Sequence, residues 1–382
     1  MANEPRETEI TLSFGTFQQP VLRPAMPTPP AKFSPSKRRL VILTEGRTEP
    51  VTAKTAACVI RYGNDEVVAL LDSTQAGKTS QELLGIGGSI PVVATLADAP
   101  GANTLLIGIA PSGGKIPPAW RPVLLEAMAR GCDVVSGLHE FLCDDPEFAA
   151  AATKHGVKLV DVRKNDERDV SKFEGFRAGC LRIHTVGQDC SCGKMVVSVE
   201  VARGLSKRGH DCKFIATGQT GILIEGDGCP VDRVISDFLN GAVEKQILAN
   251  QHHDILVVEG QGFIAHPRYS PVTLGLLHGS LPHGLILCYE AARPHVMGMP
   301  NVKLKPLAEL RELYEKIAGA LFPTRVIGIG LNSRLLSPED AERERERVRA
   351  EMGVPVCDVF RHGPDELVNA VLALQRELFG KP

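Results

Sequence analysis

Short, uninterrupted runs of apolar residues alternate with helical patterns along most of this chain. Continuous runs rich in Val, Ile and Leu are typical of strands in a parallel sheet that helices cover on both faces. One series of runs fills the first half, and a second series begins near residue 180. The sequence therefore predicts two α/β domains. The runs are LVIL (40–43), VVALLD (67–72), PVVATL (91–96), TLLIGIA (104–110), CDVVSG (132–137), VKLVDV (157–162), CLRIHTVG (180–187), DCKFIATG (211–218), DILVVEG (254–260), GLILCYE (284–290), RVIGIGLN (325–332) and PVCDVF (355–360).

The segment HTVGQDCSCGKM (184–195) joins a predicted strand to a predicted helix. The strand ends at Gly187, a short polar loop follows, and Gly193 and Lys194 open the helix. Backbone N–H groups at such a helix start point at one anion, and Lys194 adds a mobile positive charge. The spacing is one residue longer than in the common P-loop. The residues expected to hold the phosphates of a nucleotide or a nucleotide-bearing cofactor are Gly187, Gln188, Asp189, Cys190, Ser191, Cys192, Gly193, Lys194 and Met195.

The composition and the pattern of apolar runs along the chain set the predicted domain limits. Residues 1–38 are rich in Pro, Thr and Ser and predict an extended arm. Residues 39–178 predict a Rossmann-like domain, and residues 179–382 predict a P-loop NTPase-like domain with three α/β/α layers. The boundary falls in the charged stretch RKNDERDVSKFEG (163–175). Helices are expected at 120–130, 194–208, 338–351 and 364–378.

Charge and hydropathy narrow the class of partner. The 43 basic and 45 acidic side chains give a net charge of −2, which provides no general attraction to nucleic acid or anionic lipid. No apolar run approaches the roughly 20 residues that span a bilayer. The first residues lack the layout of a secretory signal, and the ten cysteines show no disulfide framework. We expect a cytoplasmic homo-oligomer with reduced thiols and a small-molecule substrate.

Position 195 departs from the usual phosphate loop. It is Met, where a Ser or Thr hydroxyl normally binds Mg²⁺ beside the phosphates. This weakens the case for conventional hydrolysis of ATP with Mg²⁺. The phosphates of coenzyme A, which is itself an ADP derivative, are the other candidate occupant. From the residues alone, either ATP or coenzyme A can be the cofactor at this loop.

Three further motifs have simpler explanations. The triplet at 77–79, Gly-Lys-Thr, lacks the preceding glycine of a phosphate loop. Asp72 ends a predicted strand, where Rossmann folds place a ribose-binding carboxylate, but no G-x-G-x-x-G precedes it, so NAD binding is not expected. Cys190 and Cys192, with His184 nearby, make a poor zinc site because the loop needs its N–H groups free. No metal site is predicted.

The loop spacing resembles that of dethiobiotin synthetase. In that comparison Glu259, which follows the apolar run 255–258, is similar to the carboxylate on the second nucleotide-binding strand and is a candidate metal ligand or base. Asn332 ends the run RVIGIGLN and sits where related proteins place an asparagine against the nucleotide base.

From about residue 39 onward the chain also resembles the DgcN-like family, P-loop proteins with an N-terminal Rossmann-like domain that include D-glutamate N-acetyltransferase. The strings that carry this resemblance are GIAPSGGKIPPAW (108–120), VVSGLHEFLCDDPEF (134–148), GQDCSCGKM (187–195), TGQTGILIEGDGCPVD (217–232), SDFLNGAVE (236–244) and EGQGFIAHPRYSPVTLGLLHG (259–279). The resemblance implies transfer of an acetyl group from acetyl-CoA to the amine of D-glutamate or a similar amino acid.

Such chemistry needs a base for the ammonium and positive charge for the carboxylates. The candidate catalytic residues are Glu259, His266 and Lys194. The candidate substrate-binding residues are Gln261, Arg268, Arg293 and Lys115. Of the three histidines His266, His278 and His283, one is expected to act directly. Two alternatives remain: an ATP-dependent ligase or kinase that activates a carboxylate, and a nucleotide-binding regulatory protein.

Overall fold

The computed structural model describes residues 38–380. Apart from Arg38, the predicted N-terminal arm lies outside the described residues. Within them, two six-stranded sheets and a short hairpin are present, and no helix is both long enough and apolar enough to cross a membrane.

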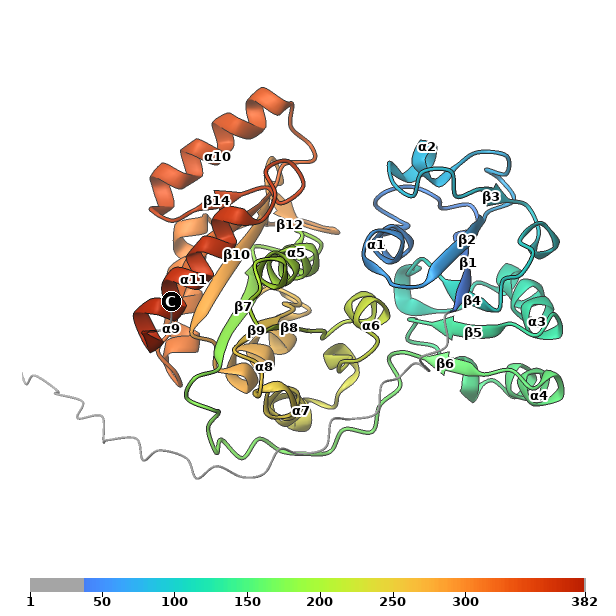
Figure 1. Ribbon diagram of the computed structural model, residues 1–382, viewed down its shortest axis with the longest axis horizontal. Coiled ribbons are helices and arrows are strands. Elements are labelled where there is room, and N and C mark those ends of the chain that lie inside the picture. The colour runs from blue at the N-terminus through green and yellow to red at the C-terminus, as the bar shows by residue number, and fades with distance from the viewer. Residues whose placement is uncertain (1–37, 381–382) are drawn as a thin grey trace, which may run out of the picture.

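The first sheet is parallel throughout and has the strand order β3-β2-β1-β4-β5-β6 (Figure 1). The order reverses between β1 and β4, as in the Rossmann arrangement. Its strands are β1 (Arg39–Leu43), β2 (Glu66–Leu71), β3 (Val92–Val93), β4 (Thr104–Ile107), β5 (Asp133–Ser136) and β6 (Leu159–Asp161). Its helices are α1 (Lys54–Tyr62), α2 (Ser80–Leu84), α3 (Arg121–Ala129) and α4 (Pro146–His155).

The second sheet is also parallel and has the order β14-β13-β10-β7-β9-β8. Its strands are β7 (Leu181–Gly187), β8 (Cys212–Ile215), β9 (Ile255–Val258), β10 (Gly284–Glu290), β13 (Arg325–Asn332) and β14 (Val356–Cys357). The helices are α5 (Lys194–Lys207), α6 (Gln219–Glu225), α7 (Ser236–Asn250), α8 (Ser270–Ser280), α9 (Leu307–Gly319), α10 (Pro338–Met352) and α11 (Asp365–Phe379). Strands β11 (His295–Val296) and β12 (Met299–Lys303) form an antiparallel hairpin.

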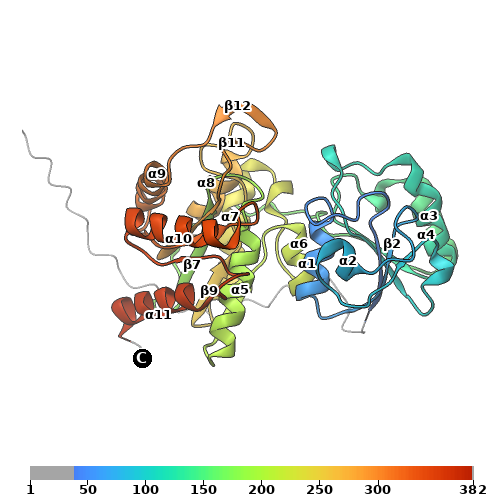
Figure 2. The same ribbon diagram turned by 90° about the horizontal axis from the view of Figure 1, so that it is seen from above.

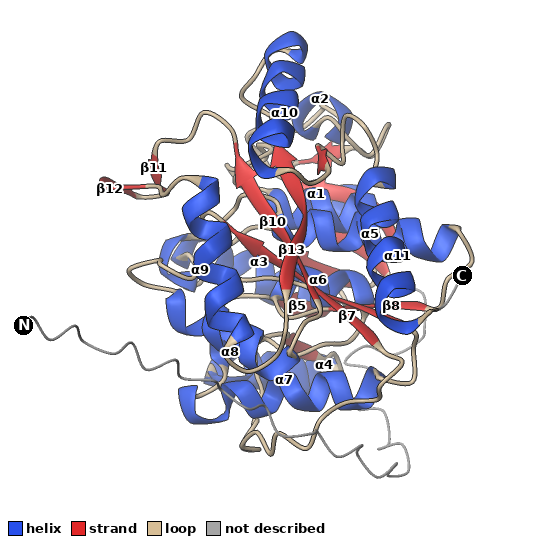
Figure 3. Ribbon diagram, turned by 90° about the vertical axis from the view of Figure 1, so that its left-hand side faces the viewer, coloured by secondary structure: helices blue, strands red, loops and turns tan. Residues whose placement is uncertain are grey.

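Helices cover both faces of the second sheet. Helices α5 and α11 pack together on one face, whereas α8 and α9 contact β7 and β13 from the other (Figure 3). Strands β7 and β10 are buried along their whole length, which explains the apolar run of β10. β7 also buries three polar side chains, Arg182, His184 and Thr185. The predicted fold class, a Rossmann-like domain followed by a three-layer P-loop domain, is confirmed.

Two predicted strands are much shorter than their apolar runs. In the run at 91–96, only Val92 and Val93 form a strand, because Thr95 binds the Asp98 carboxylate through its side chain and its N–H and starts a 3₁₀ turn. In the run at 355–360, the strand stops before Asp358, whose carboxylate accepts the N–H groups of Ser333 and Phe360.

Helix α6 lies between the two sheets. By position in the chain it follows β8 of the second sheet, yet it packs against α1 of the first (Figure 2). A buried contact of 3.1 Å joins the hydroxyls of Thr220 on α6 and Thr55 on α1. Leu223 reaches the face of the first sheet, where its neighbours are Leu40, Val59, Leu106 and Val135. The first sheet therefore completes its core with a helix from the second half of the chain.

A buried arginine joins the same two parts. Arg163 follows β6, and its Nη2 donates to Gln219 Oε1 at the start of α6 at 2.6 Å. Its Nε pairs with Asp232 at 3.0 Å, and its Nη1 donates to the Gly137 carbonyl. Because the guanidinium has partners on both sides, it fixes α6 against the end of the first sheet.

Candidate active site at the phosphate loop

The loop between β7 and α5 lies at the carboxyl edge of the second sheet, beside the position where the strand order reverses. Ligands of parallel α/β sheets bind at such positions. Gly193 has a φ of 108° and Ser191 a φ of 53°. Residues other than glycine rarely adopt the positive φ of Gly193, so a glycine is required there. A chain that turns in this way directs successive N–H groups toward one point.

The N–H groups of the loop provide an anion cradle. Gln188 N donates to the Cys288 carbonyl at 2.9 Å, and Cys190 N donates to its neighbour Asp189 at 2.7 Å. Four further N–H groups find no acceptor anywhere between residues 38 and 380, and they belong to Ser191, Cys192, Gly193 and Lys194. Unpaired N–H groups at a helix start are suited to bind a phosphate group.

Lys194 is folded back over this loop. Its side chain is 6% exposed, and its Nζ donates to the Asp189 carbonyl at 2.7 Å. Gly187 makes room for it, because a Cβ there would lie 2.9 Å from Lys194 Nζ. No carboxylate in the described part of the chain forms an ion pair with Lys194. Its Nζ also lies 3.7 Å from Cys192 Sγ, a weak acceptor, so an ammonium with three donors can still bind an anion.

Asp189 holds the loop from inside. Its side chain is buried, and Oδ2 accepts hydrogen bonds from Arg293 Nη1 at 2.9 Å and from Met297 N at 2.7 Å. Arg293 also donates to the Cys190 carbonyl at 2.8 Å and pairs with Glu290 at the end of β10. The structure therefore places Arg293 against the loop, with its charge balanced by two carboxylates. Its predicted role as a clamp for the substrate carboxylate stays a prediction.

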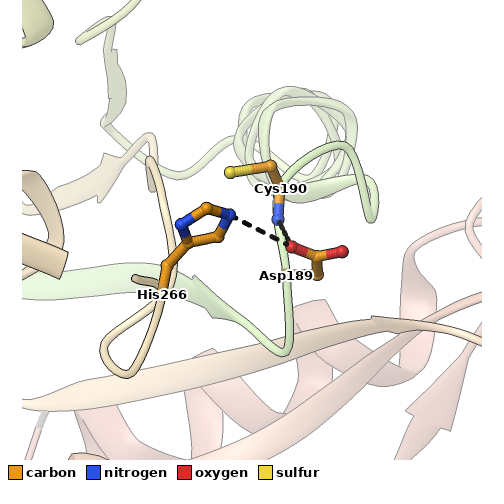
Figure 4. Close-up of side chains that lie close together, drawn as sticks. All are labelled: Asp189, Cys190 and His266. Carbon is orange, nitrogen blue, oxygen red and sulfur yellow. Dashed lines mark hydrogen bonds and ion pairs between the residues drawn. The ribbon is translucent and has the colours of Figure 1, made fainter. Parts of the chain in front are cut away.

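His266 faces the loop beside Asp189 (Figure 4). Its Nδ1 accepts a hydrogen bond from Arg268 N at 3.0 Å, so the neutral ring carries its proton on Nε2. This Nε2 lies 3.8 Å from Asp189 Oδ1. Burial lowers the pKa of His266, although the Asp189 carboxylate opposes that shift. At 3.8 Å the Nε2–H faces the Asp189 carboxylate but lies beyond hydrogen-bond distance of it.

Asp189, Cys190 and His266 each offer a metal-binding atom, and these atoms lie within 4.8 Å of one another. Both oxygens of Asp189 already accept hydrogen bonds, and a guanidinium lies 2.9 Å from one of them. A positive charge at that distance opposes a cation. The donor set therefore matches a braced loop better than a metal centre.

Glu259 directly follows β9 and is 4% exposed. Its Oε2 accepts the N–H groups of Thr217 at 2.8 Å and Gly218 at 3.0 Å, which start α6. Its Oε1 has no hydrogen-bond donor within residues 38–380. Burial raises the pKa of Glu259 to about 7, although those two N–H groups lower it. Gly221 leaves space for the carboxylate, since a Cβ there would lie 2.4 Å from Oε2.

The remaining predicted residues differ in their distance from the loop. A Cβ at Gly218 would lie 2.1 Å from Gln261 Nε2 and 3.3 Å from Glu259 Oε1, so these two side chains share the start of α6. Asn332 ends β13, and its Cβ lies 4.0 Å from the Cβ position of Gly193. Gln188 is turned outward, with its Nε2 on the Lys305 carbonyl at 2.9 Å.

Met195, Arg268 and Lys115 complete the predicted set. Met195 packs partly buried against the main hydrophobic core. Arg268 is exposed, and its N–H anchors His266. Lys115 is exposed on the first domain, in a loop whose Ile116 N–H binds Glu140 at 2.6 Å. No contact of Lys115 with the phosphate loop is present among the described residues.

Two of the other motifs have local structural roles. Thr79 caps α2 and forms a capping box with Glu82, which accounts for the Gly-Lys-Thr triplet. Asp72 is buried and accepts hydrogen bonds from Thr48 at 2.5 Å and from Thr74 at 2.7 Å.

Sequence reasoning did not anticipate Lys54 or Arg163 near the site. Lys54 is the first residue of α1, and its Nζ lies 3.2 Å from Ser191 Oγ in the phosphate loop. In the string TAKTAA (52–57) nothing separates it from an ordinary surface lysine. Its place depends on how the first sheet docks on the second, and a single sequence carries no signal for that docking.

The parallel sheet and the loop between β7 and α5 define a P-loop protein, here joined to a Rossmann-like domain. Residues 169–368 match the family model described as "Domain of unknown function (DUF1611_C) P-loop domain", and residues 73–165 match the corresponding "DUF1611_N Rossmann-like domain". The chain belongs to this DUF1611 family.

Relatives with assigned names support the same placement. The chain is 41% identical over 279 residues to the D-glutamate N-acetyltransferase of Tritonibacter scottomollicae, which covers 73% of this chain and 84% of that protein. It is 36% identical over 269 residues to a D-glutamate N-acetyltransferase of a Pseudoalteromonas species, covering 70% and 81%. A crystal structure of a DUF1611 family protein from Anabaena variabilis has a TM-score of 0.84 and 38% identity, and the match covers 88% of this chain and 100% of that one.

Proposed function

We propose that this protein transfers an acetyl group from acetyl-CoA to the amine of D-glutamate or a similar amino acid. The observation that carries the proposal is the 41% identity to a D-glutamate N-acetyltransferase across 84% of that protein. The geometry adds a phosphate cradle and a buried carboxyl group at one edge of one sheet.

The loop residues suit phosphate groups without a bound metal better than they suit ATP with Mg²⁺. Four unpaired N–H groups and Lys194 supply hydrogen-bond donors and positive charge. The position that normally offers a hydroxyl to Mg²⁺ holds Met195, which packs into the core instead. This donor set suits the phosphates of coenzyme A, which need no metal bound beside them.

Glu259 is the proposed general base. An ammonium must lose a proton before its nitrogen can attack a thioester, and a base is most effective when its pKa lies near the working pH. Burial raises the pKa of Glu259 to about 7, and its Oε1 is free to accept the proton. As the nitrogen–carbon bond forms, the carbon–sulfur bond of the thioester breaks, and the leaving thiolate takes up the second proton that the nitrogen loses.

The other predicted residues take supporting roles in this proposal. His266 packs beside Asp189 and supports the loop, and Lys194 binds a cofactor phosphate. Arg268 follows His266 by two residues, and its guanidinium is exposed. It is the proposed partner of a substrate carboxylate. Gln261, beside Glu259, is placed to bind the substrate through its amide.

Mass spectrometry tests the function directly. The purified protein is incubated with acetyl-CoA and a panel of D- and L-amino acids, and parallel samples receive ATP with Mg²⁺. We expect an acetylated product with D-glutamate and little with L-glutamate, which is the matched control. Release of ADP without any acetylated product would replace this proposal with an ATP-dependent ligase. No product in either set would favour a nucleotide-binding regulatory role.

A further inference from the structure

We propose that Lys54, supplied by the Rossmann-like domain, is a second phosphate-binding cation that completes the phosphate loop of the other domain. The inference rests on the proposed binding of coenzyme A phosphates at this loop. It adds a residue outside the loop and makes the cofactor site a joint product of both domains.

The position of Lys54 is fixed by helix α1. Its Nζ lies 3.2 Å from Ser191 Oγ, in the loop itself. The next residue, Thr55, contacts Thr220 of α6 in the buried interface at 3.1 Å. At the other end of α1, Tyr62 donates to Glu200 of α5 at 2.6 Å. Because α1 is held at both ends against the second domain, Lys54 is presented to the loop from a rigid element.

The charges around Lys54 leave it without a balancing carboxylate. No ion pair of Lys54 with an acidic side chain is present within residues 38–380. Lys54 is exposed over part of its side chain, and its Nζ lies against the loop. Desolvation at that end lowers the pKa of its ammonium, and the positive charges of Lys194 and Arg163 lower it further, whereas Cys58 and Cys190 oppose the shift. Burial raises the pKa of both thiols, so neither supplies a negative charge at neutral pH.

Lys54 and Lys194 are thus two cations at one loop, and neither forms an ion pair with a protein carboxylate. Bringing two like charges together in a partly desolvated site is unfavourable unless an anion binds between them. The Ser191 hydroxyl and the unpaired loop N–H groups lie at the same place. A diphosphate carries enough negative charge to balance both ammonium groups, which identifies the ligand class as a nucleoside diphosphate moiety.

Binding of ADP and of coenzyme A to the full-length protein tests this role by calorimetry, without any need for turnover. We expect Lys54→Gln to weaken both ligands about tenfold, since it removes one charged hydrogen bond. Lys54→Arg should restore most of the affinity. Lys158→Gln, which alters an exposed lysine of the same domain, is the matched control and should leave both dissociation constants unchanged. The salt dependence of binding should also become shallower in Lys54→Gln.

Kinetics with S-acetylpantetheine, which lacks the phosphates, separates phosphate binding from a general structural effect. Lys54→Gln should lower kcat/KM for acetyl-CoA and leave kcat/KM for S-acetylpantetheine unchanged. Equal affinity of the wild type and Lys54→Gln for ADP and coenzyme A would overturn the inference, as would a wild type that binds neither ligand. If the wild type binds both ligands, loses affinity with Lys54→Gln and yet acetylates no amino acid, the proposed function fails while the role of Lys54 stands.

Discussion

At the scale of single residues, Glu259 combines two requirements that oppose each other. Two N–H groups at the start of α6 stabilise its ionised form, whereas complete burial favours the neutral form. Burial has the larger effect, so the carboxyl group changes its charge near pH 7 instead of near its ordinary value. A structural cap alone would be satisfied by a carboxylate with an ordinary pKa, and the shift is what favours a role in proton transfer.

Replacing Glu259 should affect turnover and stability in different ways. We expect Glu259→Gln to lower kcat by at least about 100-fold, because the base is lost. In the wild type, kcat should rise with pH through about 7, as the carboxyl group loses its proton. The raised pKa makes the folded state bind the proton more tightly than the unfolded state. This residue should therefore destabilise the wild type by roughly 3 kcal/mol as pH rises from about 4.5 to 7, and Glu259→Gln should not show that change.

Denaturation in urea at several pH values measures the free energy of unfolding, and steady-state assays across the same pH range measure kcat. Full activity of Glu259→Gln at neutral pH would remove the residue from catalysis and leave it as a cap of α6.

His266 offers a separate test, because its buried ring lies beside Asp189 and faces the phosphate loop. We expect His266→Ala to raise the KM for acetyl-CoA roughly fivefold to tenfold, or about 1 kcal/mol of binding, because the loop loses the ring that lies beside Asp189, with a smaller change in kcat. His266→Gln, which keeps an N–H donor, should recover part of the loss. His278→Ala is the control, since His278 binds the Ile317 carbonyl at 3.2 Å on α9. A large fall in kcat with an altered pH profile would instead make His266 the base.

At the scale of elements, the phosphate loop depends on backbone shape more than on side-chain identity. We expect Gly193→Ala to abolish measurable binding of coenzyme A, because Gly193 has a φ of 108° that alanine rarely adopts. Space is not the limit, since the nearest atom to a Cβ there is 4.0 Å away. Gly353→Ala changes a glycine with a φ of 64° after α10, and it should cost about 1 kcal/mol of stability without altering binding. Calorimetry and thermal unfolding of both variants would separate the two effects.

The elements themselves were largely predictable. The apolar runs locate all twelve strands of the two sheets, and the helix expected at 194–208 forms as Lys194–Lys207. The expectation at 338–351 corresponds to Pro338–Met352, where Ser337 caps the start and Gly353 ends the helix. These signals are local, because burial on both faces of a sheet and capping side chains act within a few residues. The hairpin of β11 and β12 carries no such apolar run and was not anticipated.

The candidate site could be predicted only where its residues directly follow predicted strands. The loop 187–195 and Glu259 follow from strand ends, which meet at one edge of a parallel sheet. The pairing of Arg293 with Asp189 joins residues 104 positions apart, and that of Lys54 with Ser191 joins residues 137 positions apart. Such contacts depend on tertiary packing, which the pattern of a single sequence does not encode.

At the scale of the whole molecule, the two sheets share one hydrophobic core. The largest cluster of buried apolar residues contains Leu40 and Leu105 of the first sheet together with Ile222 and Leu223 of α6 and Val197 of α5. The buried Arg163 adds hydrogen bonds across the same boundary. The two halves are therefore expected to unfold together.

Separating the halves tests this expectation. A fragment of residues 169–382 leaves Leu223 without its partners on the first sheet, so we expect it to form larger assemblies than the full chain forms at the same concentration. The same fragment with Leu223→Ser should self-associate less, which is the control for an apolar cause. Size-exclusion chromatography with light scattering measures both. A monodisperse fragment that unfolds cooperatively would show that each half folds by itself.

Helix α6 has one more consequence. Its apolar side is part of the core of the first sheet, and its first N–H groups hold the Glu259 carboxylate. Any loosening of the contact between the domains would admit water to that carboxyl group and lower its pKa toward the ordinary range. The acidity of one side chain thus reports how tightly two domains are closed. With Glu259 as the proposed base, the pH of best activity would depend on the packing of a helix that makes no contact with the reacting atoms.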